Sequence, residues 1–130
     1  FSTEGKKVAL IGHLVLQPDA LKGASEVYII ERDPKSGDYP DSACEYILPD
    51  CDIVIMTASA AINKTLPRLL ELSKNAVSII IGPTTPLCPE LKALGIDRLS
   101  GMVVRDKSAF EAWATASHGS PYKHGDVFMI

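Results

Sequence analysis

Hydrophobic residues gather in short, nearly continuous runs along this chain, and polar or turn-forming stretches separate them. Five of these runs are rich in valine and isoleucine: 7–12, 26–31, 52–57, 77–82 and 101–104. A short apolar run without alternation is typical of a strand that is buried on both faces, as in a parallel sheet covered by helices. The pattern therefore predicts an α/β fold built on parallel strands.

The stretch between the third and fourth runs predicts a helix. Its apolar residues follow helical spacing along one stripe: Ile62, Leu66, Leu69 and Leu70. Proline removes an N–H group and clashes one turn back, so Pro67 belongs in the first turn of this helix. We therefore expect the helix to begin near Asn63 or Lys64, after a loop at 59–62. Either Asn63 or Thr65 is the expected cap.

Two more segments carry a serine and a glutamate three residues apart, which is the spacing of a capping box. Ser42 and Glu45 predict a short helix after the second strand. Ser108 and Glu111 predict the last helix. That helix is expected to bury three residues: Phe110, Trp113 and Ala114. The tail after it predicts a turn followed by an edge strand, or a segment that docks on a partner.

Composition and charge restrict the classes of protein. The 130 residues suit one domain, and 46% hydrophobic with 22% charged residues is typical of a globular chain. With 13 basic and 16 acidic residues, the net charge of −3 and the lack of a basic cluster argue against nucleic-acid binding. No apolar run reaches the roughly 18 to 20 residues of a membrane span. Three cysteines without a framework spacing favour reduced thiols and a cytoplasmic location.

Polar residues follow the ends of the predicted strands, and the carboxyl ends of parallel strands are where open α/β sheets bind ligands. The candidate site residues are Gly12 and His13 after the first strand, Glu31 at the end of the second, Thr57, Ser59, Asn63 and Thr65 after the third, and Gly82, Pro83, Thr84 and Thr85 after the fourth. Their hydroxyls and the free loop N–H groups suit a carboxylate or a phosphate, and Lys64 at a helix start would add positive charge. The alternative is structural: the threonines satisfy a proline-fixed turn, and Asn63 or Thr65 is only a cap.

Glu31 stands about twenty residues after Gly12, as does the acidic residue that binds ribose hydroxyls in dinucleotide-binding folds. The glycine-rich fingerprint is missing, so a standard NAD site is not expected, and pairing with Arg32 is the structural alternative for Glu31. His13 suits a role as acid, base or ligand, or as a hydrogen-bonded loop residue. No cysteines or histidines have ligand spacing, so no metal-binding residues are expected.

Several motifs taken together resemble one known family. They are "ALIGH", "DYPDSACE", "NKT", "GPTTP" and "LSGMVV". These segments are similar to the carboxyl-terminal Rossmann-like domain of an uncharacterised prokaryotic family labelled "putative heavy-metal chelation" (domain of unknown function 364), and the resemblance covers about Lys7 to Asp106. It implies a Rossmann-like three-layer fold with a mostly parallel sheet of five or more strands. It also implies that residues 1–130 are the second domain of a longer protein, whose enolase amino-terminal-like domain is missing.

The resemblance implies a site in the cleft between the two domains, and three functions remain open. The first is binding or conversion of an anionic, heteroaromatic or metal-chelating small molecule, such as a pterin-, flavin- or siderophore-like ligand. The second is binding of a nucleotide or S-adenosylmethionine, with Glu31 on the ribose. The third is a non-catalytic chelate carrier assembled as a homodimer. The residues alone neither name a cofactor nor decide between an enzyme and a carrier.

Overall fold

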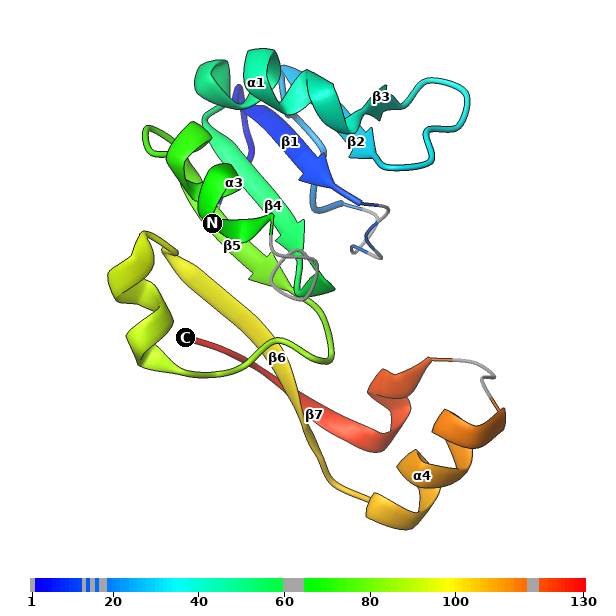
Figure 1. Ribbon diagram of the computed structural model, residues 1–130. Helices are drawn as coiled ribbons and strands as arrows, with labels where there is room; N and C mark the ends of the chain where they lie inside the picture. The colour runs from blue at the N-terminus through cyan, green and yellow to red at the C-terminus, as the bar shows by residue number, and fades with distance from the viewer. Residues whose placement is uncertain (1, 13, 15, 17–18, 60–64, 117–119) are drawn as a thin grey trace.

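Seven strands form one sheet in the computed structural model, which describes residues 2–12, 14, 16, 19–59, 65–116 and 120–130 (Figure 1). The strands are β1 Lys7–Ile11, β2 Glu26–Glu31, β3 Tyr39–Pro40, β4 Ile53–Thr57, β5 Val77–Ile81, β6 Arg98–Val104 and β7 Gly125–Met129. Their order in the sheet is β3-β2-β1-β4-β5-β6-β7. All neighbouring pairs are parallel except β6 and β7, which pair antiparallel. The expected α/β fold with a mostly parallel sheet is therefore confirmed.

Short helices and 3₁₀ turns connect the strands. They are η1 Asp41–Ala43, α1 Cys44–Ile47, η2 Leu48–Asp50, α3 Leu66–Leu72, η3 Pro89–Leu94, α4 Lys107–Ala116 and η4 Pro121–His124. The first turn of α3 contains Pro67, as predicted. The loop predicted at 59–62 is wrong at Ser59, which is helical. The predicted helix start at Asn63 or Lys64 lies outside the described residues.

Of the side chains predicted to cap helices, those that the structure describes do not do so. No side-chain hydrogen bond caps η1 or α1, and Glu45 instead pairs with Arg68 of α3. At α4 the capping acceptor is Asp106, whose Oδ1 accepts a hydrogen bond from the Ala109 N–H at 3.0 Å. Thr65 occupies the N-cap position of α3 without a side-chain capping hydrogen bond. The aspartate before α4 reaches the third amide of the helix, which a serine inside the first turn cannot do.

Strand β4 lies at the centre of the core and buries side chains on both faces of the sheet, because successive side chains point to opposite faces. Val54 and Met56 belong to the cluster that includes the buried leucines of α3 and Leu48 of η2. Ile53 and Ile55 belong to a second cluster on the other face, which the β1–β2 connection covers. The result is a Rossmann-like three-layer arrangement, with α1 and α3 on one face of the sheet.

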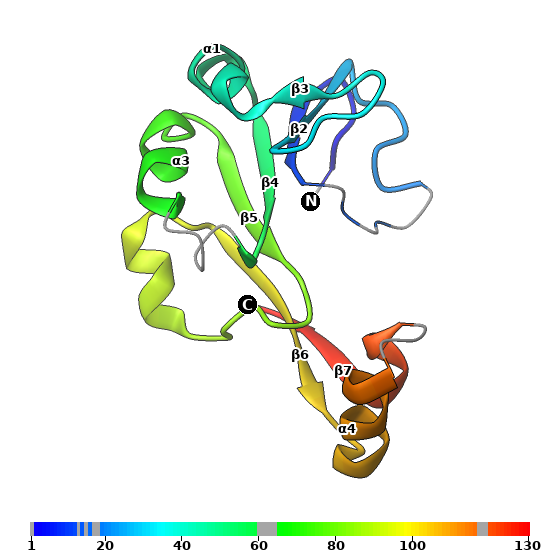
Figure 2. The same cartoon turned by 45° about the vertical axis from the view of Figure 1, so that its right-hand side comes forward.

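Residues 102–116 and 120–129 form an arm that projects from the rest of the sheet, as Figures 1 and 2 show. The arm contains the outer part of β6, α4, η4 and β7, the edge strand that the tail predicts. The predicted buried face of α4 is wrong. Phe110 and Trp113 are only half-buried, with ring centroids 5.4 Å apart, and Ala114 is exposed, because the helix packs on η4 of the same arm. Across the described residues, no helix combines the length and the apolar character needed to cross a membrane.

Candidate functional site

A cavity of about 490 Å³ lies at the carboxyl ends of β1, β2 and β4, where α1 and α3 approach the sheet. Five residues from the sequence-predicted set line it: Gly12, Glu31, Thr57, Ser59 and Thr65. They come from segments that are distant in sequence and meet because parallel strands place their carboxyl ends at one edge. His13 and Asn63 belong to the predicted set but lie outside the described residues.

The ends of β1 and β4 approach each other closely at the rim of the cavity. Gly12 has a φ of +94°, and a Cβ built on it would lie 3.1 Å from Cγ2 of Thr57. Its N–H donates to the Ile30 carbonyl at 2.8 Å, which continues the pairing of β1 with β2 past the end of the strand. The hydroxyl oxygens of Thr57 and Ser59 are 2.5 Å apart. A glycine at this position therefore allows the backbone and two hydroxyl groups to converge on one point.

The floor of the cavity is apolar. It is formed by Ile11, Ile30, Leu69 and Leu72, with the thiol of Cys44 beside them. Burial raises the pKa of Cys44 to about 11, so the thiol is neutral at physiological pH. Cys44 and Cys51 are both buried and free.

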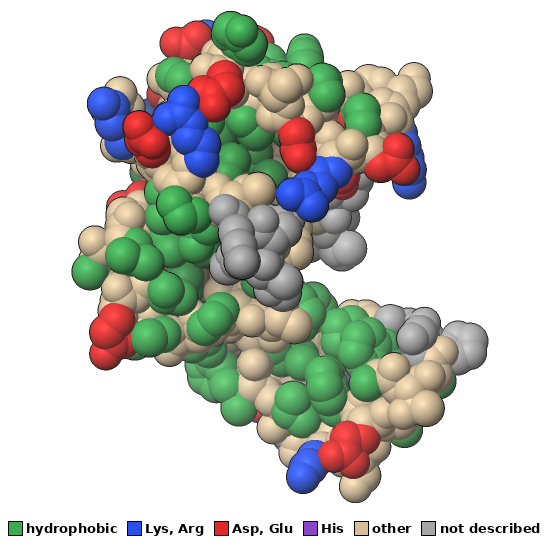
Figure 3. Space-filling model, viewed as in Figure 1, with side chains coloured by type: hydrophobic (Ala, Val, Ile, Leu, Met, Phe, Trp, Pro, Cys, Tyr) green, Lys and Arg blue, Asp and Glu red, His purple; other side chains and the backbone are tan. Residues whose placement is uncertain are grey.

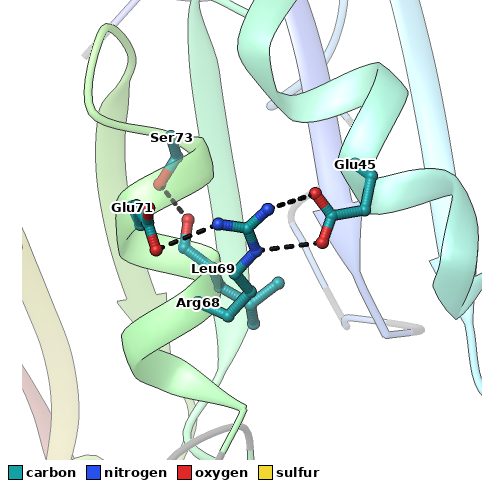
Figure 4. Close-up of polar contacts among 5 residues, drawn as sticks. All are labelled: Glu45, Arg68, Leu69, Glu71 and Ser73. Carbon is teal, nitrogen blue, oxygen red and sulfur yellow. Dashed lines mark hydrogen bonds and ion pairs between the residues drawn. The ribbon is translucent and has the colours of Figure 1, made fainter.

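Charged side chains stand on the walls of the cavity. Arg68 of α3 donates from Nε to Oε1 of Glu45 at 2.9 Å and from Nη2 to Oε2 at 2.5 Å, while its Nη1 is 3.0 Å from Oε2 of Glu71 (Figure 4). Hydrogen bonding to Arg68 holds the pKa of the Glu45 carboxyl below its usual range. A second ion pair joins Arg32 Nε to Asp41 Oδ2 at 3.3 Å. Figure 3 shows the apolar floor exposed between charged groups on this face.

Sequence reasoning missed Asp41, Glu45 and Arg68 as residues of the site. Glu45 and Arg68 are 23 positions apart and meet only because α1 and α3 pack side by side on the sheet. The one signal available was the charge on the short connections that follow β2 and β4. Asp41 and Glu45 stand one helical turn apart on the η1–α1 segment, so both ion pairs hold that segment.

The turn "GPTTP" at 82–86 does not line the cavity. A Cβ on Gly82 would lie 3.7 Å from Cβ of Ala58, so the turn borders the residue that follows β4. Thr84 is exposed, whereas Thr85 is only 5% exposed. The Thr85 N–H donates to the Gly82 carbonyl at 3.1 Å. The buried Oγ1 of Thr85 has no hydrogen-bond partner among the residues that the structure describes. The structure thus brings the first three predicted segments together at one cavity and leaves the fourth beside it.

The described residues do not include three or more histidine, cysteine, aspartate or glutamate side chains placed to hold a metal ion. Glu31, Asp41 and Glu45 all line the cavity without forming such a group. The positive charges of Arg32 and Arg68 stand beside two of these carboxylates. This donor set suits an organic ligand with charged groups better than a bare cation.

Comparisons with known proteins show the family of this chain and agree with its fold. The family described as "Putative heavy-metal chelation" (domain of unknown function 364) matches residues 2–126. A crystal structure of a protein with unknown function from this family, from Desulfitobacterium hafniense, is 41% identical with a TM-score of 0.91, covering 98% of this chain and 53% of that chain. A second, from Pyrococcus horikoshii, is 28% identical with a TM-score of 0.84, covering 96% of this chain and 54% of that one.

A curated relative, an uncharacterized protein of Methanocaldococcus jannaschii, is 32% identical over 108 residues, which are 78% of this chain and 42% of the relative. The chain therefore spans about half the length of the proteins that it matches.

Proposed function

We propose that this chain, which belongs to the family described as "Putative heavy-metal chelation", binds a small organic molecule in the cavity at the carboxyl ends of β1, β2 and β4. The observation that carries the proposal is the position of the cavity. The sheet continues from β1 to β2 and β3 on one side and to β4 and β5 on the other. Open α/β sheets bind ligands at such a reversal of strand order.

The size and lining of the cavity support this proposal. Its volume of about 490 Å³ falls in the range of roughly 300 to 1,000 Å³ that is usual for small-molecule sites. The apolar floor suits a heteroaromatic ring, and the Thr57 and Ser59 hydroxyls and the Glu31 carboxylate supply a few convergent polar groups. A pterin-, flavin- or siderophore-like molecule has this combination of features.

The word "chelation" in the family description is compatible with an organic ligand. The described side chains do not fit a metal ion bound directly, because no cluster of metal-binding side chains occurs among them. In our proposal any metal reaches the cavity already held by a chelating ligand. The protein would then recognise the organic part of the chelate, as either an enzyme or a carrier.

A nucleoside is the second candidate ligand. Glu31 and Gly12 both line the cavity at the ends of β2 and β1, which is the arrangement that binds ribose in dinucleotide-binding folds. This candidate predicts that Glu31→Ala abolishes binding of adenosine or S-adenosylmethionine in calorimetry. Unchanged binding by the variant would reject the nucleoside.

We further propose that a second domain completes the site. The chain spans about half of its relatives' length, and Figure 3 shows its surface hollowed between the sheet and the arm. In a longer protein, a domain seated there would stand next to the rim of the cavity.

A panel of pterins, flavins, catechol chelators and nucleosides, screened by thermal shift and calorimetry, tests the proposed function. Ser42 is exposed and lines the cavity, so Ser42→Trp should fill the cavity without disturbing the core. We expect at least one class to bind the parent and to bind Ser42→Trp about tenfold more weakly or worse. Ser108→Trp, on the exposed surface of α4, is the matched control. The proposal fails if no class binds, or if both tryptophan variants bind as the parent does.

A further inference from the structure

The ion pair between Arg68 and Glu45 belongs to the wall of the cavity. Both side chains line it, and they extend toward each other from α3 and α1 (Figure 4). About half of each side chain remains exposed, 53% for Arg68 and 47% for Glu45. An ion pair that solvent reaches to this degree contributes little to stability. Stability alone therefore does not explain why this charged pair stands on the wall of a cavity whose floor is apolar.

The geometry of the pair is that of oxyanion recognition. Arg68 Nε and Nη2 each donate to one oxygen of the Glu45 carboxylate, at 2.9 and 2.5 Å. Two parallel N–H groups in this fork match a carboxylate or a phosphate. The Glu45 carboxylate thus occupies the position that an anionic group of a ligand would occupy.

Glu71 gives Arg68 a second acidic contact that does not involve Glu45. The third nitrogen of Arg68, Nη1, is 3.0 Å from Glu71, which lies on the same face of α3 at i+3. This contact comes from within one helix, so it does not depend on the position of α1. The guanidinium group can therefore exchange one carboxylate for another without losing its contact with Glu71.

The opposite end of the segment 41–45 carries a second ion pair with an arginine. Asp41, one helical turn before Glu45, pairs with Arg32 after β2, and both of these residues also line the cavity. The segment 41–45 thus provides the acidic partner for each of the two cavity arginines. Removing either acidic partner would take away one negative charge beside a cavity arginine.

We infer that Arg68 is the anion-recognising residue of this cavity and that Glu45 is the counter-ion that a ligand carboxylate or phosphate displaces. The inference rests on the proposed function and adds the charge class of the ligand. A polycarboxylate chelator and a phosphorylated compound share this oxyanion chemistry. Citrate and inorganic phosphate, used as separate probes, distinguish the two sources.

The test is a calorimetric titration of each probe at fixed, low ionic strength against two charge variants. Arg68→Gln removes the receptor and should weaken binding about tenfold or more. Glu45→Gln removes the competing carboxylate and should tighten binding of the same probe. A purely structural ion pair predicts that both variants change binding in the same direction or leave it unchanged. The opposite signs therefore separate ligand recognition from helix packing.

The controls use an ion pair of the same kind outside the cavity. Arg105 and Asp126 form a half-exposed pair at 2.6 Å on the arm, so Arg105→Gln and Asp126→Asn should leave binding unchanged. Arg68→Lys keeps the charge but loses the fork, and an intermediate affinity is expected. If Arg68→Gln fails to fold, the affinity of Arg68→Lys and the direction in which Glu45→Gln changes the affinity still test the inference.

The possible failures have different patterns. The inference is overturned if neither probe binds, or if Glu45→Gln does not tighten binding. The proposed function nevertheless stands if a ligand of the screening panel binds the parent and binds Ser42→Trp much more weakly. Probe binding that Ser42→Trp leaves intact would place the anion outside the cavity and overturn the inference as well.

Discussion

At Gly12 the backbone has a φ of +94°, and a Cβ built there would lie 3.1 Å from Cγ2 of Thr57. Gly37 has a similar φ of +88°, but apart from its own chain neighbours no heavy atom of the described residues lies within 4 Å of a Cβ built on it. The two glycines therefore separate backbone strain from steric contact. Of these two glycines, only Gly12 is placed so that an added side chain would meet a neighbour. That neighbour, Thr57, belongs to the candidate site.

We expect Gly12→Ala to destabilise the protein by about 1 to 3 kcal/mol and Gly37→Ala by less, because both variants strain the backbone and only the first displaces Thr57. Urea unfolding of both variants measures the difference. Equal losses would mean that the contact with Thr57 has no energetic consequence.

The two buried thiols predict that the stability of the folded protein depends on pH. Burial raises the pKa of Cys44 and Cys51 from 9.0 to about 11. In this range the folded state binds more protons than the unfolded chain, so stability should fall as the pH rises from about 9 to 11. Urea unfolding across this range checks the slope, and Cys44→Ala with Cys51→Ala should make it shallower. A slope that the double variant leaves unchanged would assign the loss to other groups.

Among the secondary-structure elements, the strands were the most predictable from sequence. A run of consecutive β-branched residues has few alternatives to a buried strand, and the predicted 26–31 coincides with β2 while 77–82 differs from β5 by one residue. β3 was missed because its two residues include Pro40 and have no apolar run. Capping was also mispredicted, since the side chains that compete for helix ends depend on tertiary neighbours. Glu45 is the clearest case, because it turns away from its own helix to Arg68.

The start of α4 offers a direct test of which residue caps it. Asp106 Oδ1 accepts from the Ala109 N–H, whereas Ser108 was the predicted cap. We expect Asp106→Ala to destabilise the helix by about 1 kcal/mol and Ser108→Ala to have little effect. Amide hydrogen exchange within residues 107–116 measures both. Equal loss of protection in the two variants would mean that Ser108 contributes to capping as much as Asp106 does.

For the whole molecule, the sheet topology decides which residues at the cavity were predictable from sequence and which were not. Gly12, Glu31 and Thr57 were found from sequence because the carboxyl end of each parallel strand reaches one edge of the sheet. Arg68 and Glu45 were not, since their pairing depends on how α1 and α3 pack. The tail predicted the edge strand of the arm, but the position of α4 on the arm was not predictable, because its apolar pattern is that of a helix packed on a core.

The arm leaves apolar side chains uncovered on both faces of its two strands. Val127 and Phe128 are 56% and 50% exposed and, as neighbours in β7, they point to opposite faces. Val103 of β6 is 53% exposed, and β7 is the last strand of the sheet. A two-stranded ribbon is marginally stable without packing on at least one face. Exposed apolar surface of this kind favours association between copies of the chain.

We therefore expect the 130-residue chain to self-associate in a concentration-dependent manner in sedimentation velocity, in line with the homodimer of the chelate-carrier hypothesis. Phe128→Asp should shift the chain toward monomer, because it places a charge at the centre of the uncovered ribbon. Tyr46→Asp is the matched control: Tyr46 is 81% exposed but stands on α1, away from the arm. If the parent is monomeric at every concentration, the arm is stable uncovered and the expected homodimer is wrong. If both variants dissociate the assembly equally, net charge and not the arm drives association.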